Sequence, residues 1–257
     1  MGMDRRKFMK VAGVTALGVA SGARSKMLAR GTSRMTAGES PRTGTRWAMV
    51  IDLKKCAEAD GCKDCINACH VTHNVPKFDS PKDEIKWIWK EPFERAFHSQ
   101  ENEYFGEELK HGPTLLLCNH CDNPPCVRVC PTQATWKREG DGIVMMDWHR
   151  CIGCRYCVAA CPYGSRSFNW RDPRPHIADI DDDYPTRNRG VVEKCTFCEE
   201  RLAKGQLPAC VEACKAKAIV FGDLEDPDSE IRAILGERFT IRRKPELGTK
   251  PEVYYLV

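Results

Sequence analysis

Cysteine spacing constrains the fold of this chain more than any other feature of its sequence. Sixteen of the 257 residues are cysteines, and they fall into four groups of four with none left over. The groups are Cys56, Cys62, Cys65 and Cys69; Cys118, Cys121, Cys126 and Cys130; Cys151, Cys154, Cys157 and Cys161; and Cys195, Cys198, Cys210 and Cys214. Cysteines three residues apart in a tight loop cannot reach good disulfide geometry with each other. The spacing therefore favours metal ligation over a disulfide scaffold.

The third group carries the most specific motif. From Cys151 to Pro162 it reads C-x2-C-x2-C-x3-C-P, the run with which bacterial ferredoxins ligate [4Fe–4S] clusters. Three cysteines of such a run hold one cluster, and the fourth ligates the neighbouring cluster. Gly153 allows a close approach of the loop backbone. The motif predicts an iron–sulfur protein with paired clusters.

An internal repeat predicts how the groups combine. Met49-Val-Ile-Asp-Leu-Lys-Lys before Cys56 resembles Val144-Met-Met-Asp-Trp-His-Arg before Cys151. The segment around Cys210 and Cys214 likewise resembles the segment around Cys126 and Cys130, so the first group corresponds to the third and the fourth to the second. Residues 134–147 carry a β-hairpin signal at Gly140-Asp-Gly.

The repeat predicts an α+β fold with two ferredoxin-like 2[4Fe–4S] modules, one contiguous and inserted in the other. Long loop insertions and an extended C-terminal tail complete the predicted architecture. The predicted segments are a leader over 1–40, the first half of the split module over 41–75, an insertion over 76–117, the contiguous module over 118–170, an insertion over 171–194, the second half of the split module over 195–222 and the tail over 223–257. Both insertions are interpreted as candidate docking surfaces, with a solvated loop as the alternative for the second, and the tail is expected to lie along a neighbouring surface rather than form a core.

The crossing rule for the fourth cysteine predicts four ligand sets, each for one [4Fe–4S] cluster. We name them site A (Cys56, Cys62, Cys65 and Cys214), site B (Cys195, Cys198, Cys210 and Cys69), site C (Cys118, Cys121, Cys126 and Cys161) and site D (Cys151, Cys154, Cys157 and Cys130). Sites A and B depart from the ferredoxin pattern, because the first group opens C-x5-C and no proline follows Cys69 or Cys214.

The first residues have the pattern of an export signal. Arg5 and Arg6 are followed by Phe8, Lys10 and a weakly apolar stretch over 11–23. This order is typical of a twin-arginine signal, which moves proteins that are already folded, and a chance basic start is the alternative. The signal predicts a periplasmic location or the outer face of the cytoplasmic membrane.

Other classes of function find little support. Thirty per cent of the residues are charged and no apolar run reaches 18 residues, so a multispanning membrane protein is excluded and any membrane association is peripheral. A net charge of +4 without a basic stripe gives no nucleic-acid interface. The sequence has no C-x-x-C-H motif, so no covalently attached haem is expected. It also has no phosphate-binding loop and no nucleophile motif, which favours a non-catalytic electron-transfer role. A zinc-stapled interaction module remains an alternative, since the fourth group reads C-x2-C-x11-C-x3-C.

Two histidines and several basic residues lie near the cysteines. His70 and His73 are expected to be structural or surface residues rather than ligands. Lys63, Arg128, Arg155 and Lys194 lie in or beside the cysteine loops, where positive charge raises reduction potentials, although a solvent-facing side chain is the favoured interpretation for each.

From the first group to the C-terminus, the chain resembles the four-cluster iron–sulfur subunits of membrane-associated respiratory complexes. Cys118-Asn-His-Cys-Asp-Asn-Pro-Pro-Cys and Cys195-Thr-Phe-Cys carry this resemblance. Together with the export signal, Phe168-Asn-Trp-Arg-Asp-Pro-Arg-Pro and Thr240-Ile-Arg-Arg-Lys-Pro, they resemble the DsrO-type subunits of DsrMKJOP and of the similar Hdr-like menaquinol-oxidising (Hme) complexes. The resemblance implies a quinone-interacting NrfD-like membrane subunit and a multihaem cytochrome c as partners, in sulfur metabolism. The alternative is an iron–sulfur subunit of a molybdopterin oxidoreductase or hydrogenase.

Overall fold

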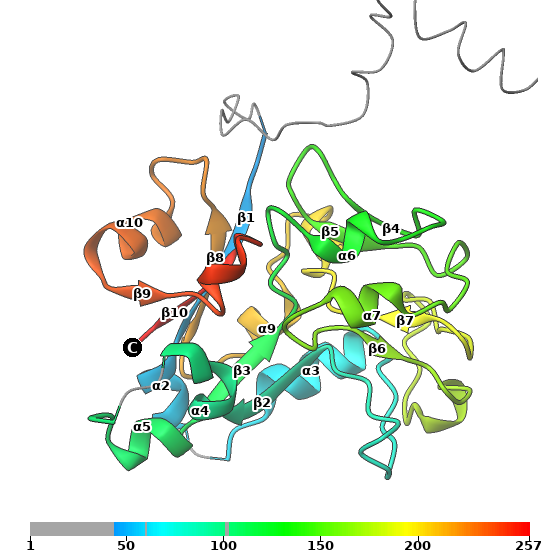
Figure 1. Cartoon of the computed structure of the whole chain (residues 1–257), viewed down its shortest axis with the longest axis horizontal. Coiled ribbons are helices and arrows are strands. Elements are labelled where there is room, and N and C mark those ends of the chain that lie inside the picture. The colour runs from blue at the N-terminus through cyan, green and yellow to red at the C-terminus, as the bar shows by residue number, and fades with distance from the viewer. Residues whose placement is uncertain (1–43, 60, 101–102) are drawn as a thin grey trace, which may run out of the picture. The chain divides into compact units, whose positions relative to one another are not determined.

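A computed structural model describes residues 44–59, 61–100 and 103–257 (Figure 1). The strands are β1 (Trp47–Asp52), β2 (Ile88–Pro92), β3 (Pro113–Leu117), β4 (Thr135–Lys137), β5 (Val144–Met146), β6 (Ser167–Phe168), β7 (Val192–Glu193), β8 (Ile219–Asp223), β9 (Thr240–Ile241) and β10 (Val253–Leu256). The α-helices are α2 (Leu53–Glu58), α3 (Asp64–Thr72), α4 (Phe93–Ala96), α5 (Glu107–His111), α6 (Pro125–Arg128), α7 (Tyr156–Ala160), α8 (Glu199–Leu202), α9 (Ala209–Glu212) and α10 (Glu230–Glu237). Short 3-10 helices cover His98–Gln100, Arg174–His176 and Pro245–Leu247. The expected export signal lies outside the described residues.

The largest sheet among the described residues has the strand order β8-β1-β10-β9. Successive side chains of β1 point to opposite faces, as the pleat requires. Ala48 and Val50 pack with Ile231 of α10 on one face, and Met49 and Ile51 belong to the main core on the other. The sheet is therefore buried on both sides, which explains the nearly continuous apolar run of β1.

The prediction that the tail lies along a surface without joining a core is wrong. Strand β10 pairs in parallel with β1, Met49 opposite Val253, and Val253 and Tyr255 are fully buried. Helix α10 packs against β8 and β1, on the face of the sheet that carries Ala48 and Val50 (Figure 1). The alternation of Val253-Tyr-Tyr-Leu supplies apolar side chains to both faces, but a parallel partner 200 residues away leaves no local signal.

The predicted hairpin over 134–147 is confirmed, with β4 and β5 antiparallel and Thr135 opposite Met146. Strands β1 and β8 form a second antiparallel pair, in which Ile51 lies opposite Ile219. The two registers are equivalent. Thr135 lies five residues after Cys130, and its partner Met146 lies five residues before Cys151. In the same way, Ile219 lies five residues after Cys214, and its partner Ile51 lies five residues before Cys56.

The two predicted insertions contribute to the core, which corrects their interpretation as surfaces alone. Strands β2 and β3 form an antiparallel hairpin whose Trp87 and Leu116 are buried in the main core. In the second insertion Arg187 and Glu193 are buried, and Glu193 accepts a 2.9 Å hydrogen bond from Trp87 Nε1. The insertions carry buried apolar and paired polar side chains because the cysteine modules are too small to enclose themselves.

Within the described part of the chain, every helix is too short or too polar to cross a lipid bilayer.

Candidate iron–sulfur sites

Site A forms where α2, α3 and the chain after α9 meet. One cavity is lined by Cys56, Cys62, Cys65 and Cys214 together with Leu115, Ala216, Ala218, Ile219, Ala59 and Lys90. Asp52 caps α2, with Oδ1 accepting a 3.1 Å bond from Lys55 N, and so fixes the helix that carries Cys56. Lys90 Nζ donates a 2.8 Å bond to the Cys62 carbonyl.

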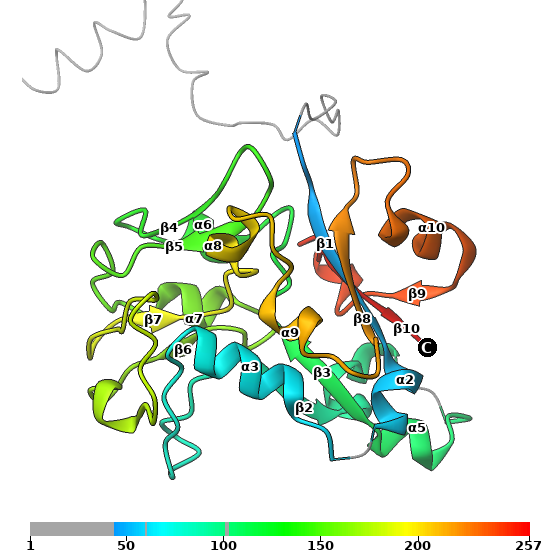
Figure 2. The ribbon, with the colours of Figure 1, turned by 180° about the vertical axis from the view of Figure 1, so that it is seen from behind.

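Site B is enclosed between α3 and α9, which lie side by side (Figure 2). Cys69, Cys195, Cys198 and Cys210 line one cavity, and all four are buried. Two backbone N–H groups donate to sulfur here: Phe197 N to Cys195 Sγ and Ala209 N to Cys198 Sγ, both at 3.4 Å. Burial raises the pKa of the Cys69 and Cys210 thiols well above the ordinary value. Thiolates in such a site need a bound cation to remain charged.

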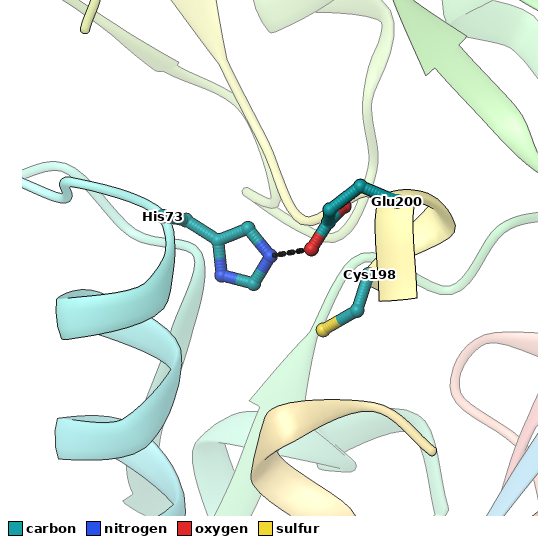
Figure 3. Close-up of side chains that lie close together, drawn as sticks. All are labelled: His73, Cys198 and Glu200. Atoms are coloured by element: carbon teal, nitrogen blue, oxygen red, sulfur yellow. Dashed lines mark hydrogen bonds and ion pairs between the residues drawn. The ribbon is translucent and has the colours of Figure 1, made fainter. Parts of the chain in front are cut away.

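His73 lines the cavity of site B and pairs with Glu200 (Figure 3). The His73 Nδ1–H donates to the Cys69 carbonyl at 2.8 Å, and Nε2 lies 3.0 Å from Glu200 Oε1. The ring stacks on Trp87, with centroids 4.9 Å apart. Although His73, Cys198 and Glu200 have ligand atoms within 4.8 Å of one another, Cys198 also lines site B. His73 is buried and held by these contacts, and its structural role stays a prediction.

Site C brings together Cys118, Cys121, Cys126 and Cys161. Burial raises the pKa of Cys121, and the neighbouring Cys118, Cys126 and Cys161 thiolates raise it further. Burial also raises the pKa of Cys161, with Cys118 as the next cause. Only Cys161 of this set is partly exposed.

Site D is the most exposed of the four sites. Cys130, Cys151 and Cys157 pack in one apolar cluster with Val144 and Met146 of β5, whereas Cys154 lies outside this cluster. Only Cys157 of the site is buried. Gly153 has φ +69°, and a Cβ there would clash with the Gly190 carbonyl, so only glycine suits this loop.

Neighbouring ligand sets adjoin one another in the order A, B, C, D. The pKa values of Cys69 and Cys210 in site B are raised mainly by burial, then by the other thiols of site B, and then by the Cys65 thiolate of site A. Sites A and B therefore adjoin. Sites B and C adjoin through Cys195 and Cys118: burial raises the pKa of Cys195 to about 12, and the Cys118 thiolate is the next cause. Burial raises the pKa of Cys157 most, and Cys126 acts in the same direction, which places site C beside site D.

Buried cations lie beside these sites. Lys194 is fully buried, so the solvent-facing interpretation is wrong for this residue. Its Nζ donates to the Val144 carbonyl and, at 2.7 Å, to the Cys195 carbonyl. Lys63, Arg128 and Arg155 are exposed, as expected.

The sequence did not predict the direct contact between an arginine and a cysteine sulfur. The Arg166 side chain is buried, and its Nη2 donates to Cys126 Sγ at 3.1 Å. The one sequence feature that pointed to this contact is the position of Arg166, five residues after Cys161.

The residues at sites A and B suit iron–sulfur clusters in number and chemistry. At each site four cysteines line one cavity, the donor set that a cubane requires. The fourth cysteine group does not converge into one zinc site, because Cys214 lines site A whereas Cys195, Cys198 and Cys210 line site B.

Comparison with known proteins supports iron–sulfur chemistry. A family model described as a 4Fe-4S dicluster domain matches residues 114–175 and 181–224. The Hdr-like menaquinol oxidoreductase iron-sulfur subunit 1 of Archaeoglobus fulgidus is 39% identical, covering 98% of this chain and 97% of that protein. A subunit of the tetrathionate reductase of Salmonella typhimurium is 41% identical, covering 84% and 74% respectively. The menaquinone reductase iron-sulfur cluster-binding subunit of Nitratidesulfovibrio vulgaris is 36% identical, covering 82% and 88%.

Proposed function

Because this chain belongs to the iron–sulfur electron-transfer subunits of quinol-linked oxidoreductases, we propose that sites A to D hold four [4Fe–4S] clusters and relay single electrons. In this proposal the electrons pass between a quinone-interacting NrfD-like membrane subunit and a cytochrome c subunit of a sulfur-metabolism complex. The relatives with menaquinol or menaquinone in their names support the quinone side.

The observation that carries the proposal is the line of four cysteine sets, A to B to C to D. When bound, the clusters supply one-electron carriers whose potentials depend on burial, hydrogen bonds to sulfur and nearby charge. The chain's own residues hold the sulfur ligands, exclude water from site B and direct N–H groups at Cys195 and Cys198. A continuous series of adjoining sites suits electron relay.

We further infer that one ferredoxin-like module is inserted in the other. Support comes from the equivalent registers of β4 with β5 and of β8 with β1. In the contiguous module a hairpin joins the two strands, whereas in the split module β1 lies before the insert and β8 after it.

Location on the outer face of the cytoplasmic membrane, after export by the twin-arginine route, belongs to the same proposal. A signal that exports folded proteins suits clusters inserted in the cytoplasm. The alternative is that the same clusters serve a molybdopterin oxidoreductase or hydrogenase. Similarity to a subunit of a tetrathionate reductase supports a reductase as the partner.

Metal analysis of the full chain, purified without oxygen, tests cluster binding. We expect about sixteen irons and as many acid-labile sulfides per chain, with coupled signals in electron paramagnetic resonance (EPR) during a reductive titration. Zinc without sulfide would overturn the proposal. Cys214→Ser is expected to perturb the cluster of site A, and Cys69→Ser that of site B, although each cysteine belongs to the other site's sequence group.

Purification from detergent-solubilised membranes of the native host tests the partners. A tagged chain is expected to bring down an integral membrane protein and a c-type cytochrome that stains for haem. Recovery of a molybdopterin subunit in their place would favour the alternative.

A further inference from the structure

Arg166 lies on the loop between Cys161 and β6, and its guanidinium reaches between two cysteine sites. Nη2 donates to Cys126 Sγ of site C at 3.1 Å and to Thr135 Oγ1 at 2.8 Å. Nη1 lies 3.7 Å from Met146 Sδ. Cys157 of site D packs in the same cluster as Cys126 and Met146, and the Arg166 charge lowers the pKa of its thiol against the larger, raising effect of burial. Only 4% of the residue is exposed.

No carboxylate compensates this charge within the described residues, where Arg166 has no ion pair. Arg187 shows the contrast: it is fully buried too, but Glu193 lies 2.7 Å away. An unpaired buried guanidinium carries a large desolvation cost, and it cannot lose its proton. The negative groups that face Arg166 are cysteines of sites C and D: Cys126, Cys157, Cys118 and Cys161.

We propose that Arg166 is an electrostatic partner shared by sites C and D, whose permanent charge and N–H···S bond raise the reduction potentials of the clusters held there. The inference rests on the proposed function, because it needs clusters at both sites. Reduction adds one negative charge to a cluster, so a nearby fixed cation favours the reduced form. The hydrogen bonds of Arg166 involve no residue of sites A or B, so its influence is expected to be greatest at sites C and D.

Potentiometric titration followed by EPR tests this on the full chain. In Arg166→Gln we expect two of the four clusters to become at least tenfold harder to reduce, a shift of about 59 mV for a one-electron couple. The other two clusters should shift by much less. Arg166→Lys keeps the charge and is expected to restore most of the lost potential. Arg171→Gln is the matched control, because it removes the same charge from an exposed position paired with Asp83.

Three results would overturn the inference: unchanged potentials in Arg166→Gln, an equal shift of all four clusters, or Arg166→Lys behaving like Arg166→Gln. Iron and sulfide are measured on the same samples. Wild-type protein without clusters defeats the proposed function itself, whereas fully loaded Arg166→Gln with unchanged potentials defeats only the role of Arg166.

A measurement on wild-type protein covers the case in which Arg166→Gln fails to assemble. With arginine labelled by ¹⁵N in the guanidinium group alone, pulsed EPR of the reduced protein is expected to show nitrogen coupling to a cluster. Absence of this coupling would overturn the inference, as would its persistence in a loaded Arg166→Lys protein.

Discussion

The Arg187 guanidinium and the Glu193 carboxylate are both fully inaccessible to solvent and lie 2.7 Å apart. Glu193 also accepts bonds from Trp87 and Asn169, and Arg187 donates to the carbonyls of His73 and Asn74. These bonds join the second insertion to the chain after α3, close to site B. A buried pair with its hydrogen bonds made is tolerated, but either partner alone is costly.

Glu193→Gln is therefore expected to destabilise the protein by about 3–5 kcal/mol, because it leaves Arg187 charged and unpaired. The measurement is the temperature at which the visible cluster absorption is lost, compared with wild type. Glu84→Gln is the control: its carboxylate is half exposed and 3.8 Å from Lys86, so we expect a change within about 0.5 kcal/mol. Equal behaviour of the two variants would contradict the prediction.

At the scale of elements, the ends of the described chain meet in one sheet. Strand β1 leads directly into α2, which carries Cys56 of site A. Its neighbours β8 and β10 come from the last quarter of the sequence and close over it. Site A therefore depends on strands that the cysteine motifs do not include.

Deleting residues 253–257 is expected to prevent stable folding. It removes Val253, Tyr255 and Leu256, whose burial stabilises by about 1.5–3 kcal/mol each, a sum comparable with the whole stability of a domain. Limited proteolysis and iron content are the readouts, and a truncated chain that kept full iron would refute the prediction. Phe239→Ala, at a residue 80% exposed, is expected to leave both unchanged.

For the molecule as a whole, exposure of the ligands differs along the line of sites. All four cysteines of site B are buried, and three of site C are. Two cysteines of site A and three of site D are partly exposed. The line thus has buried middle sites and more accessible ends, which suits exchange of electrons with partners at both ends.

Iron is expected to leave the more exposed sites D and A before the buried sites B and C. With a ferrous chelator under anaerobic conditions, we expect biphasic release, in which about half of the iron leaves at least several-fold faster, from sites D and A. EPR of the remaining protein should show the signals of sites B and C. Release in a single phase, or loss of the site B signal first, would contradict the prediction.

Much of this architecture was open to prediction from sequence because ferredoxin loops are local. Cysteine spacing encodes three ligands of each cluster within one loop, and the repeat around Cys56 and Cys151 predicted matching strands. The β4–β5 hairpin followed from a turn signal between two short runs. The full ligand sets remain predictions that metal analysis must test.

The sequence by itself determined the cysteine groups, the iron–sulfur family and the strands that flank the loops, because these depend on neighbours in the chain. Only the tertiary structure decided the order of the sites, since the adjacency of Cys195 and Cys118 joins groups far apart in sequence. It alone placed β10 beside β1 and buried Lys194 and Arg166. The physical reason is that burial and charge compensation arise from contacts between distant segments, for which a single sequence has no local pattern.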